Sequence, residues 1–151
     1  MNRQPVILCL LTALLCMCGC SRLNTCETFV KVSSKDAAGR YPFSVEMTDD
    51  GAEYDFIIFL RSDCSDAFYF NMPDYQVIIS AESPSGKLYK ESLVIPKGQM
   101  KRKSGAKDVE FAYMTGVVPK EPGTWRFFLV FPQEDSIPNF RGAGLRTIKR
   151  N

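Results

Sequence analysis

Short runs of β-branched and aromatic residues, separated by turn residues, recur along this chain and constrain its fold more than any other feature. Two of the runs, YDFIIFLR at 54–61 and TWRFFLVFP at 124–132, are apolar on both faces when they are read with the two-residue period of a strand. A strand that is apolar on both faces is typical of the covered centre of a sheet. Because no long stretch has the 3.6-residue period of an amphipathic helix, we expect an all-β fold.

Eight segments have the composition of strands and are divided by turn residues such as Pro84, Gly86 and Gly51. They are Thr28–Val32, Tyr41–Met47, Tyr54–Arg61, Tyr75–Ser83, Lys87–Ile95, Asp108–Thr115, Thr124–Phe131 and Gly144–Lys149. The turns SPSGK at 83–87 and TDDGAE at 48–53 each predict a hairpin between the strands that flank them. The spacing predicts a single antiparallel β-sandwich, immunoglobulin-like or jelly-roll-like, of about seven to eight strands.

The N-terminal segment MNRQPVILCLLTALLCMCGC has a basic residue, Arg3, followed by an apolar run from Val6 to Gly19. This run is shorter than the about 20 residues that a helix needs to span a bilayer. A basic start, an apolar middle and a small residue at the end are typical of a secretory signal peptide. We therefore expect residues 1–19 to be a signal peptide, and a retained transmembrane anchor is the less favoured alternative.

Three cysteines, Cys16, Cys18 and Cys20, lie at the end of this segment. The signal of a bacterial lipoprotein ends in a lipobox, in which a small residue precedes the cysteine that receives diacylglycerol. Only Cys20 follows a small residue, Gly19, so the segment resembles that of a bacterial lipoprotein, with Cys20 as the lipidation site. Several acyl chains on one residue, such as palmitate, give stable membrane anchoring. Residues 20–27 are then the lipidated cysteine and its tether, and residues 28–151 are the sandwich domain.

Two cysteines, Cys26 and Cys64, lie beyond the lipidation site. The envelope outside the inner membrane is an oxidising compartment, in which cysteine pairs form disulfides. Spacing alone does not establish that the two residues lie close together. A disulfide between Cys26 and Cys64 and two separate cysteines therefore both remain open.

The chain has no histidine, which excludes Ser-His-Asp and Cys-His nucleophile pairs and every metal site built on imidazole. The carboxylates of Asp49, Asp50, Glu53 and Asp55 lie near one turn but lack the alternating oxygen ligands of a calcium loop, so a solvated turn is favoured. We expect no catalytic residues, metal or cofactor, and no enzymatic activity. A formal net charge of only +2 gives no general electrostatic attraction to nucleic acid.

Two segments are candidates for contact with a ligand or partner. The basic segment KGQMKRKSGAK at 97–107 includes Lys101, Arg102 and Lys103. It is either a solvated connection or a contact for an anionic glycan, a phospholipid headgroup or an acidic partner. The aromatic run Phe68–Phe70 either caps one end of the sandwich or forms an exposed loop that stacks on sugars.

Four features occur in a recognisable order along the chain. A Tyr-rich strand ends in Leu-Arg (54–61), a hairpin has Pro-x-Gly (84–86), a strand begins with Pro-Gly-x-Trp (122–125), and the chain ends in Gly-Leu-Arg-x-x-Lys (144–149). From about Tyr41 to the C-terminus, this order resembles the gliding-motility lipoprotein H (GldH) family. The basic segment stands where a Trp-Leu-Gly-like segment is expected, and Cys26 and Cys64 are not part of the family pattern.

The resemblance implies a small, non-enzymatic envelope lipoprotein that acts as a structural or adaptor component, associated with gliding motility, with protein partners in the envelope. The resemblance brings no catalytic residues. The polar positions shared with the family pattern are Arg61 and Arg146. They are either contacts for a partner or, as we favour, part of a structural ion pair that closes the sandwich. Ser21 and Arg22 differ from the acidic residues that often follow the cysteine of surface-exported lipoproteins in this bacterial group. This favours attachment to the outer membrane on its periplasmic side. The alternative function is a carbohydrate-binding accessory lipoprotein that uses the Phe68–Phe70 loop.

Overall fold

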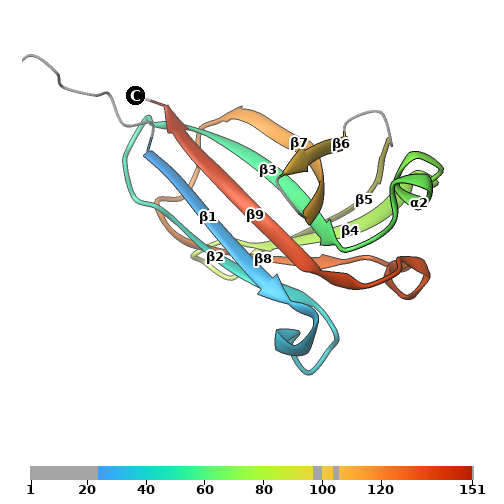
Figure 1. Cartoon of the computed structure of the whole chain (residues 1–151). Helices are drawn as coiled ribbons and strands as arrows, with labels where there is room; N and C mark the ends of the chain where they lie inside the picture. The colour runs from blue at the N-terminus through green and yellow to red at the C-terminus, as the bar shows by residue number, and fades with distance from the viewer. Residues whose placement is uncertain (1–23, 97–99, 104–105, 151) are drawn as a thin grey trace, which may run out of the picture.

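A computed structural model describes residues 24–96, 100–103 and 106–150. In these residues the chain forms two antiparallel β-sheets that pack face to face (Figure 1). The β-sandwich expected from the sequence is therefore confirmed. The segment expected to be a signal peptide, and Cys20, lie outside the described residues.

The larger sheet has five strands and the smaller sheet has four. In spatial order, the larger consists of β1 (Asn24–Lys31), β9 (Phe140–Arg150), β3 (Glu53–Ser62), β7 (Ala106–Val117) and β6 (Met100–Lys103). The smaller consists of β2 (Tyr41–Met47), β8 (Gly123–Val130), β4 (Tyr75–Glu82) and β5 (Leu88–Ile95). Three short helices, η1 (Val32–Ser34), α2 (Asp66–Phe70) and η3 (Glu134–Ser136), lie in the connections.

β3 lies at the centre of the larger sheet, between β9 and β7. Phe56, Ile58 and Leu60 belong to the core between the sheets. Phe59 is also fully buried, although it points to the opposite face. The sequence predicted this arrangement, since both faces of the segment are apolar.

The core between the sheets consists of the inward side chains of both layers. Those of the smaller sheet include Tyr41, Phe43, Val77, Ile79, Phe127 and Leu129. They alternate with outward residues, as the two-residue period of a strand requires, and on β8 these outward residues include the apolar Phe128 and Val130. Each large apolar side chain buried in this way contributes about 1.5–3 kcal/mol to the free energy of unfolding.

The two predicted hairpins have different outcomes. β4 and β5 pair directly, and in their turn Gly86 has a positive φ of 83° and its amide donates to the Ser83 carbonyl at 2.8 Å. The hairpin predicted for residues 48–53 is wrong, because β2 pairs with β8 whereas β3 pairs with β7 and β9. Gly51 does have positive φ there, so its residue type fixed a local turn but not the pairing of the flanking strands.

Two strands differ from the sequence prediction at the sheet edges. β1 begins at Asn24 rather than Thr28, so residues 24–27 belong to the sheet and not to the tether. β6, at residues 100–103, pairs with β7 inside the segment that was predicted as a basic loop. An edge strand needs no buried apolar face and often carries lysine, so hydrophobic patterning gives it little signal.

Candidate functional site

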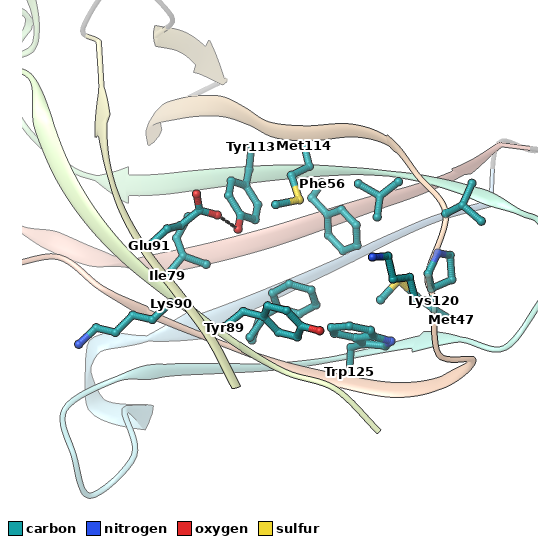
Figure 2. Close-up of a pocket in the computed structure, with 15 residues that line it drawn as sticks. Met47, Phe56, Ile79, Tyr89, Lys90, Glu91, Tyr113, Met114, Lys120 and Trp125 are labelled. Atoms are coloured by element: carbon teal, nitrogen blue, oxygen red, sulfur yellow. Dashed lines mark hydrogen bonds between the residues drawn. The ribbon is translucent and has the colours of Figure 1, made fainter. Parts of the chain in front are cut away.

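A cavity of about 540 Å³ opens between the two sheets, on the side where β5 and β7 lie (Figure 2). Its walls include Met47, Phe56, Ile79, Tyr89, Trp125 and Phe127. The volume lies within the range of pockets that hold small molecules, and an apolar, aromatic lining is typical of such pockets. We therefore take this cavity as the candidate functional site.

The smaller sheet supplies most of the aromatic wall. Tyr89 and Trp125 come from β5 and β8, and their ring centroids are 6.0 Å apart. The indole Nε1–H of Trp125 donates to the backbone carbonyl of Glu121 at 2.9 Å, which fixes the orientation of the indole. Figure 2 shows both rings along one side of the cavity, facing Phe56 and Met114 on the other.

One polar contact links the two sheets beside the cavity. The hydroxyl of Tyr113 on β7 donates to the carboxylate of Glu91 on β5 (Figure 2). Burial of Tyr113, and to a lesser extent its bond to the Glu91 carboxylate, raise the pKa of the phenol well above its ordinary value. The phenol therefore stays protonated and holds β5 against β7 through the physiological pH range.

Lysines give the margin of the cavity a basic character. Lys90 and Lys120 are among the lining residues, and the Lys87 ammonium lies 5.1 Å from the centre of the Tyr89 ring. In Figure 2 Lys120 points into the cavity, whereas Lys90 points away from it. The site thus combines an apolar interior with a cation at its margin.

Sequence reasoning missed this site. Trp125 was part of a predicted strand that is apolar on both faces, and the structure places its half-buried indole in the cavity wall. Tyr89 and Glu91 were part of a predicted strand, without any functional role. The cavity is lined by residues of both sheets, so it depends on strand pairing that the sequence pattern does not encode.

Arg61 makes a structural ion pair with Asp108. Its Nε and Nη2 donate to the two carboxylate oxygens of Asp108 at 2.8 and 2.9 Å. This bond is the largest cause that raises the pKa of Arg61, and the Asp108 side chain is fully buried. The two residues face each other across β3 and β7.

Arg146 makes a second network on the same sheet. It donates to Glu27 on β1 at 2.7 Å and to Glu110 on β7 at 3.0 Å. The guanidiniums of Arg146 and Arg61 lie 5.6 and 5.7 Å from the centre of the Phe59 ring. Because Phe59 points away from the core, these ion pairs stabilise the outer face of the larger sheet and do not close the sandwich. A partner contact by either arginine stays a prediction.

Phe59 owes its burial to a glycine on the neighbouring strand. Gly144 lies opposite Phe59, and a Cβ at position 144 would lie 2.0 Å from the ring. Phe29 on β1 also pairs with Gly144, and its ring stacks with the Phe59 ring at a centroid distance of 6.2 Å. Gly144 belongs to the C-terminal motif Gly-Leu-Arg, so the motif has a packing role here.

The structure contradicts a disulfide between Cys26 and Cys64. Cys26 is exposed on β1 opposite Thr147, while Cys64 is buried just after Ser62, which pairs with Phe140. Thr147 and Phe140 lie near opposite ends of β9, about 20 Å apart at the rise of a strand. A disulfide requires Cα atoms within about 7 Å, so the two cysteines are separate.

The aromatic run forms the short helix α2 (Asp66–Phe70), capped by the Ser65 hydroxyl, which accepts from the Phe68 amide at 3.2 Å. Tyr69 is buried and Phe68 packs against the core. Phe70 alone of the three is strongly exposed, at 70%. The Phe68 and Tyr69 rings therefore cap the sandwich, and only the Phe70 ring would be left to stack on a sugar.

The carboxylates near residues 48–55 also have structural partners. Asp55 is buried, accepts from the Gly116 amide at 2.8 Å and pairs with Arg150. Asp49 pairs with Lys149. The solvated turn expected from the sequence therefore does not describe Asp55. Among the described residues, no group of three or more His, Cys, Asp or Glu side chains could hold a metal ion.

Lys101, Arg102 and Lys103 lie in β6, where their backbones pair with β7. Lys97 lies outside the described residues. In the described part of the chain, no helix has the length and apolar character needed to cross a membrane.

The fold and the cavity define a β-sandwich protein with an apolar, aromatic-lined pocket between its sheets. Comparison with protein-family models gives no match to this chain, and comparison with curated proteins gives no significant match.

Proposed function

We propose that this chain is a lipid-anchored, non-enzymatic component of a bacterial envelope that acts as a structural or adaptor protein, in the manner of a GldH-like lipoprotein. The sequence Gly19-Cys20 supports the anchor. β1 begins at Asn24, only a few residues later, so the sandwich lies close to the membrane surface when Cys20 carries acyl chains.

The observation that carries the adaptor role is the edge strand β5. It pairs on one side with β4 and ends the order of the described smaller sheet. Its outward residues Leu88 and Val94 are 71% and 60% exposed. Natural sheets usually protect such edges with charge, and β5 carries Lys90 and Glu91 in its middle, but its two ends expose apolar side chains. An exposed edge of this kind is a site where a partner can add a strand.

Carbohydrate binding is the less supported alternative. A sugar platform requires exposed aromatic faces, and of the Phe68–Phe70 run only Phe70 offers one. Phe70 also makes a T-shaped contact with the buried Tyr69 ring, at 5.6 Å between centroids. Phe70 therefore serves as a matched control for the test of the β5 edge.

Anchoring is tested by labelling cells with an alkyne derivative of palmitate. We expect label on the wild-type chain and none on Cys20→Ser, together with protection from protease added to intact cells, as periplasmic placement requires. Label that persists in Cys20→Ser would contradict the anchor. Digestion in intact cells would instead place the protein on the cell surface.

The adaptor role is tested by photo-crosslinking in native membranes. We expect p-benzoylphenylalanine in place of Val94 to give a discrete protein adduct, which Leu88→Lys removes because a charge on an edge strand opposes strand addition. The same crosslinker in place of Phe70 is the control and should give no such adduct. In a gliding host, deletion of the gene should also abolish surface spreading, and Leu88→Lys should fail to restore it. Equal adducts from both positions would contradict a β5-specific contact.

A further inference from the structure

We propose that the cavity between the sheets binds a single acyl chain whose anionic head lies beside Lys120. This inference goes beyond the adaptor role and relies on the proposed anchor only for the position of the cavity relative to the membrane. It assigns a ligand class, a long-chain carboxylate or an anionic lipid, to a site that the sequence analysis did not identify.

The composition of the walls supports an acyl chain. Met47 and Met114 contribute flexible thioethers that adapt to an irregular chain. The other walls are mainly aromatic or aliphatic, and the Tyr113 hydroxyl is already bonded to Glu91. A ligand that fills this interior therefore needs an apolar body, because polar atoms placed there would lose their bonds to water.

The charges at the margin support an anionic head. Lys120 points into the cavity, and the Lys87 ammonium lies 5.1 Å from the centre of the Tyr89 ring in the cavity wall. The acidic groups nearby have partners of their own, since Glu91 accepts from Tyr113 and Glu121 accepts from the Ser85 amide at 3.1 Å. A carboxylate or phosphate would add a charge-assisted contact with Lys120.

The position of the cavity supports membrane lipid as the source of the acyl chain. Val117 at one end of the cavity pairs with Tyr54, Tyr54 with Lys149, and Lys149 with Asn24. These residues therefore form one row across the sheet, about 14 Å wide at the spacing of neighbouring strands. The cavity thus reaches the end of the sandwich at which the chain leaves for Cys20.

The lone tryptophan of the chain makes the test direct, because Trp125 lies in the cavity wall. The full lipoprotein is reconstituted in vesicles, and quenching of Trp125 fluorescence is measured with two brominated probes. One probe is dibromostearic acid added to unbrominated vesicles, and the other is phosphatidylglycerol with brominated acyl chains. Bromine quenches only at close range, so quenching reports a chain beside the indole.

Two alanine variants provide matched controls. Ala81 lines the cavity, so Ala81→Phe fills it and should reduce quenching to background. Ala112 is exposed on β7 of the larger sheet and does not line the cavity, so Ala112→Phe should quench like the wild type. Lys120→Glu, at an exposed position that folding tolerates, should weaken the apparent affinity for the brominated acid about tenfold and leave that for its uncharged alcohol unchanged.

The pattern of quenching identifies the occupant of the cavity. Quenching by the free acid alone identifies a fatty acid, and quenching by the phospholipid alone identifies a membrane lipid. Quenching that appears only in Cys20→Ser identifies the protein's own acyl chain as the occupant and overturns the anionic head, because the chains on Cys20 carry none. No quenching in any of these forms, or quenching that persists in Ala81→Phe, overturns the proposal. Because palmitate labelling of Cys20 and crosslinking from β5 are read separately, failure here leaves the adaptor proposal standing.

Discussion

At the scale of single residues, Tyr75 shows the cost of a buried polar atom. The ring is almost fully buried, and its hydroxyl has no hydrogen-bond partner among the described residues. Burial, with a smaller contribution from Cys64, raises the pKa of Tyr75 to about 12. An unsatisfied buried hydroxyl destabilises the folded state by about 1–3 kcal/mol.

We therefore expect Tyr75→Phe to raise the free energy of unfolding by about 1 kcal/mol in urea denaturation. The folded state holds the phenol proton more tightly than the unfolded state, so the wild type should lose stability between pH 10 and about 12, and Tyr75→Phe should lose less. Tyr41→Phe is the control, since the Tyr41 hydroxyl donates to Glu134 at 2.7 Å and its loss should destabilise. Equal destabilisation by both variants would show that the Tyr75 hydroxyl has a hydrogen-bond partner in the folded protein.

Two arginine pairs of different burial test the structural role of Arg61. Arg61→Ala leaves the fully buried carboxylate of Asp108 without its guanidinium, which should lower the free energy of unfolding by about 3 kcal/mol. Arg141→Ala removes an exposed pair with Asp63 and should cost less than about 1 kcal/mol. Urea denaturation measures both. If Arg61→Ala instead left stability unchanged and removed the crosslinked partner, the arginine would be a contact residue.

At the scale of elements, the sequence predicted strands better than it predicted their neighbours. The period of apolar residues located β3, with both faces covered, and Pro84 with Gly86 located the β4–β5 hairpin. The same kind of signal at Gly51 led to a wrong hairpin, because a turn fixes local direction while pairing depends on distant strands. The edge strand β6 had no apolar signal at all.

The link between Tyr113 and Glu91 is an element-scale device, because it joins the edge strand β5 to β7. We expect Tyr113→Phe to increase hydrogen–deuterium exchange of β5 amides while exchange in β3 stays unchanged, since local opening depends on the contacts of the element that opens. Tyr89→Phe, which keeps the ring contact with Trp125, is the matched control. Faster exchange throughout both sheets would show that the contact acts on global stability instead.

At the scale of the whole molecule, the cavity lay beyond the reach of sequence reasoning. Its walls come from β2, β3, β4, β5, β7 and β8, so it requires the full topology of the two sheets. Aromatic residues such as Trp125 and Tyr89 occur both in cavity walls and in packed cores, so their type alone does not predict a cavity. Arg61 and Arg146 were singled out by the resemblance to the GldH family, as the polar positions shared with its pattern.

The placement of the two cysteines gives a test of the whole fold. Native protein processed and lipidated at Cys20 as proposed, alkylated with N-ethylmaleimide in the absence of reductant, should gain one adduct at Cys26, which is exposed on β1. Cys64 is buried and should react only after unfolding in guanidinium, when intact mass spectrometry should count a second adduct. A disulfide would instead block both reactions until reductant is added. Because the two positions lie near opposite ends of β9, such a result would contradict the pairing of β1, β9 and β3 and with it the arrangement of the larger sheet.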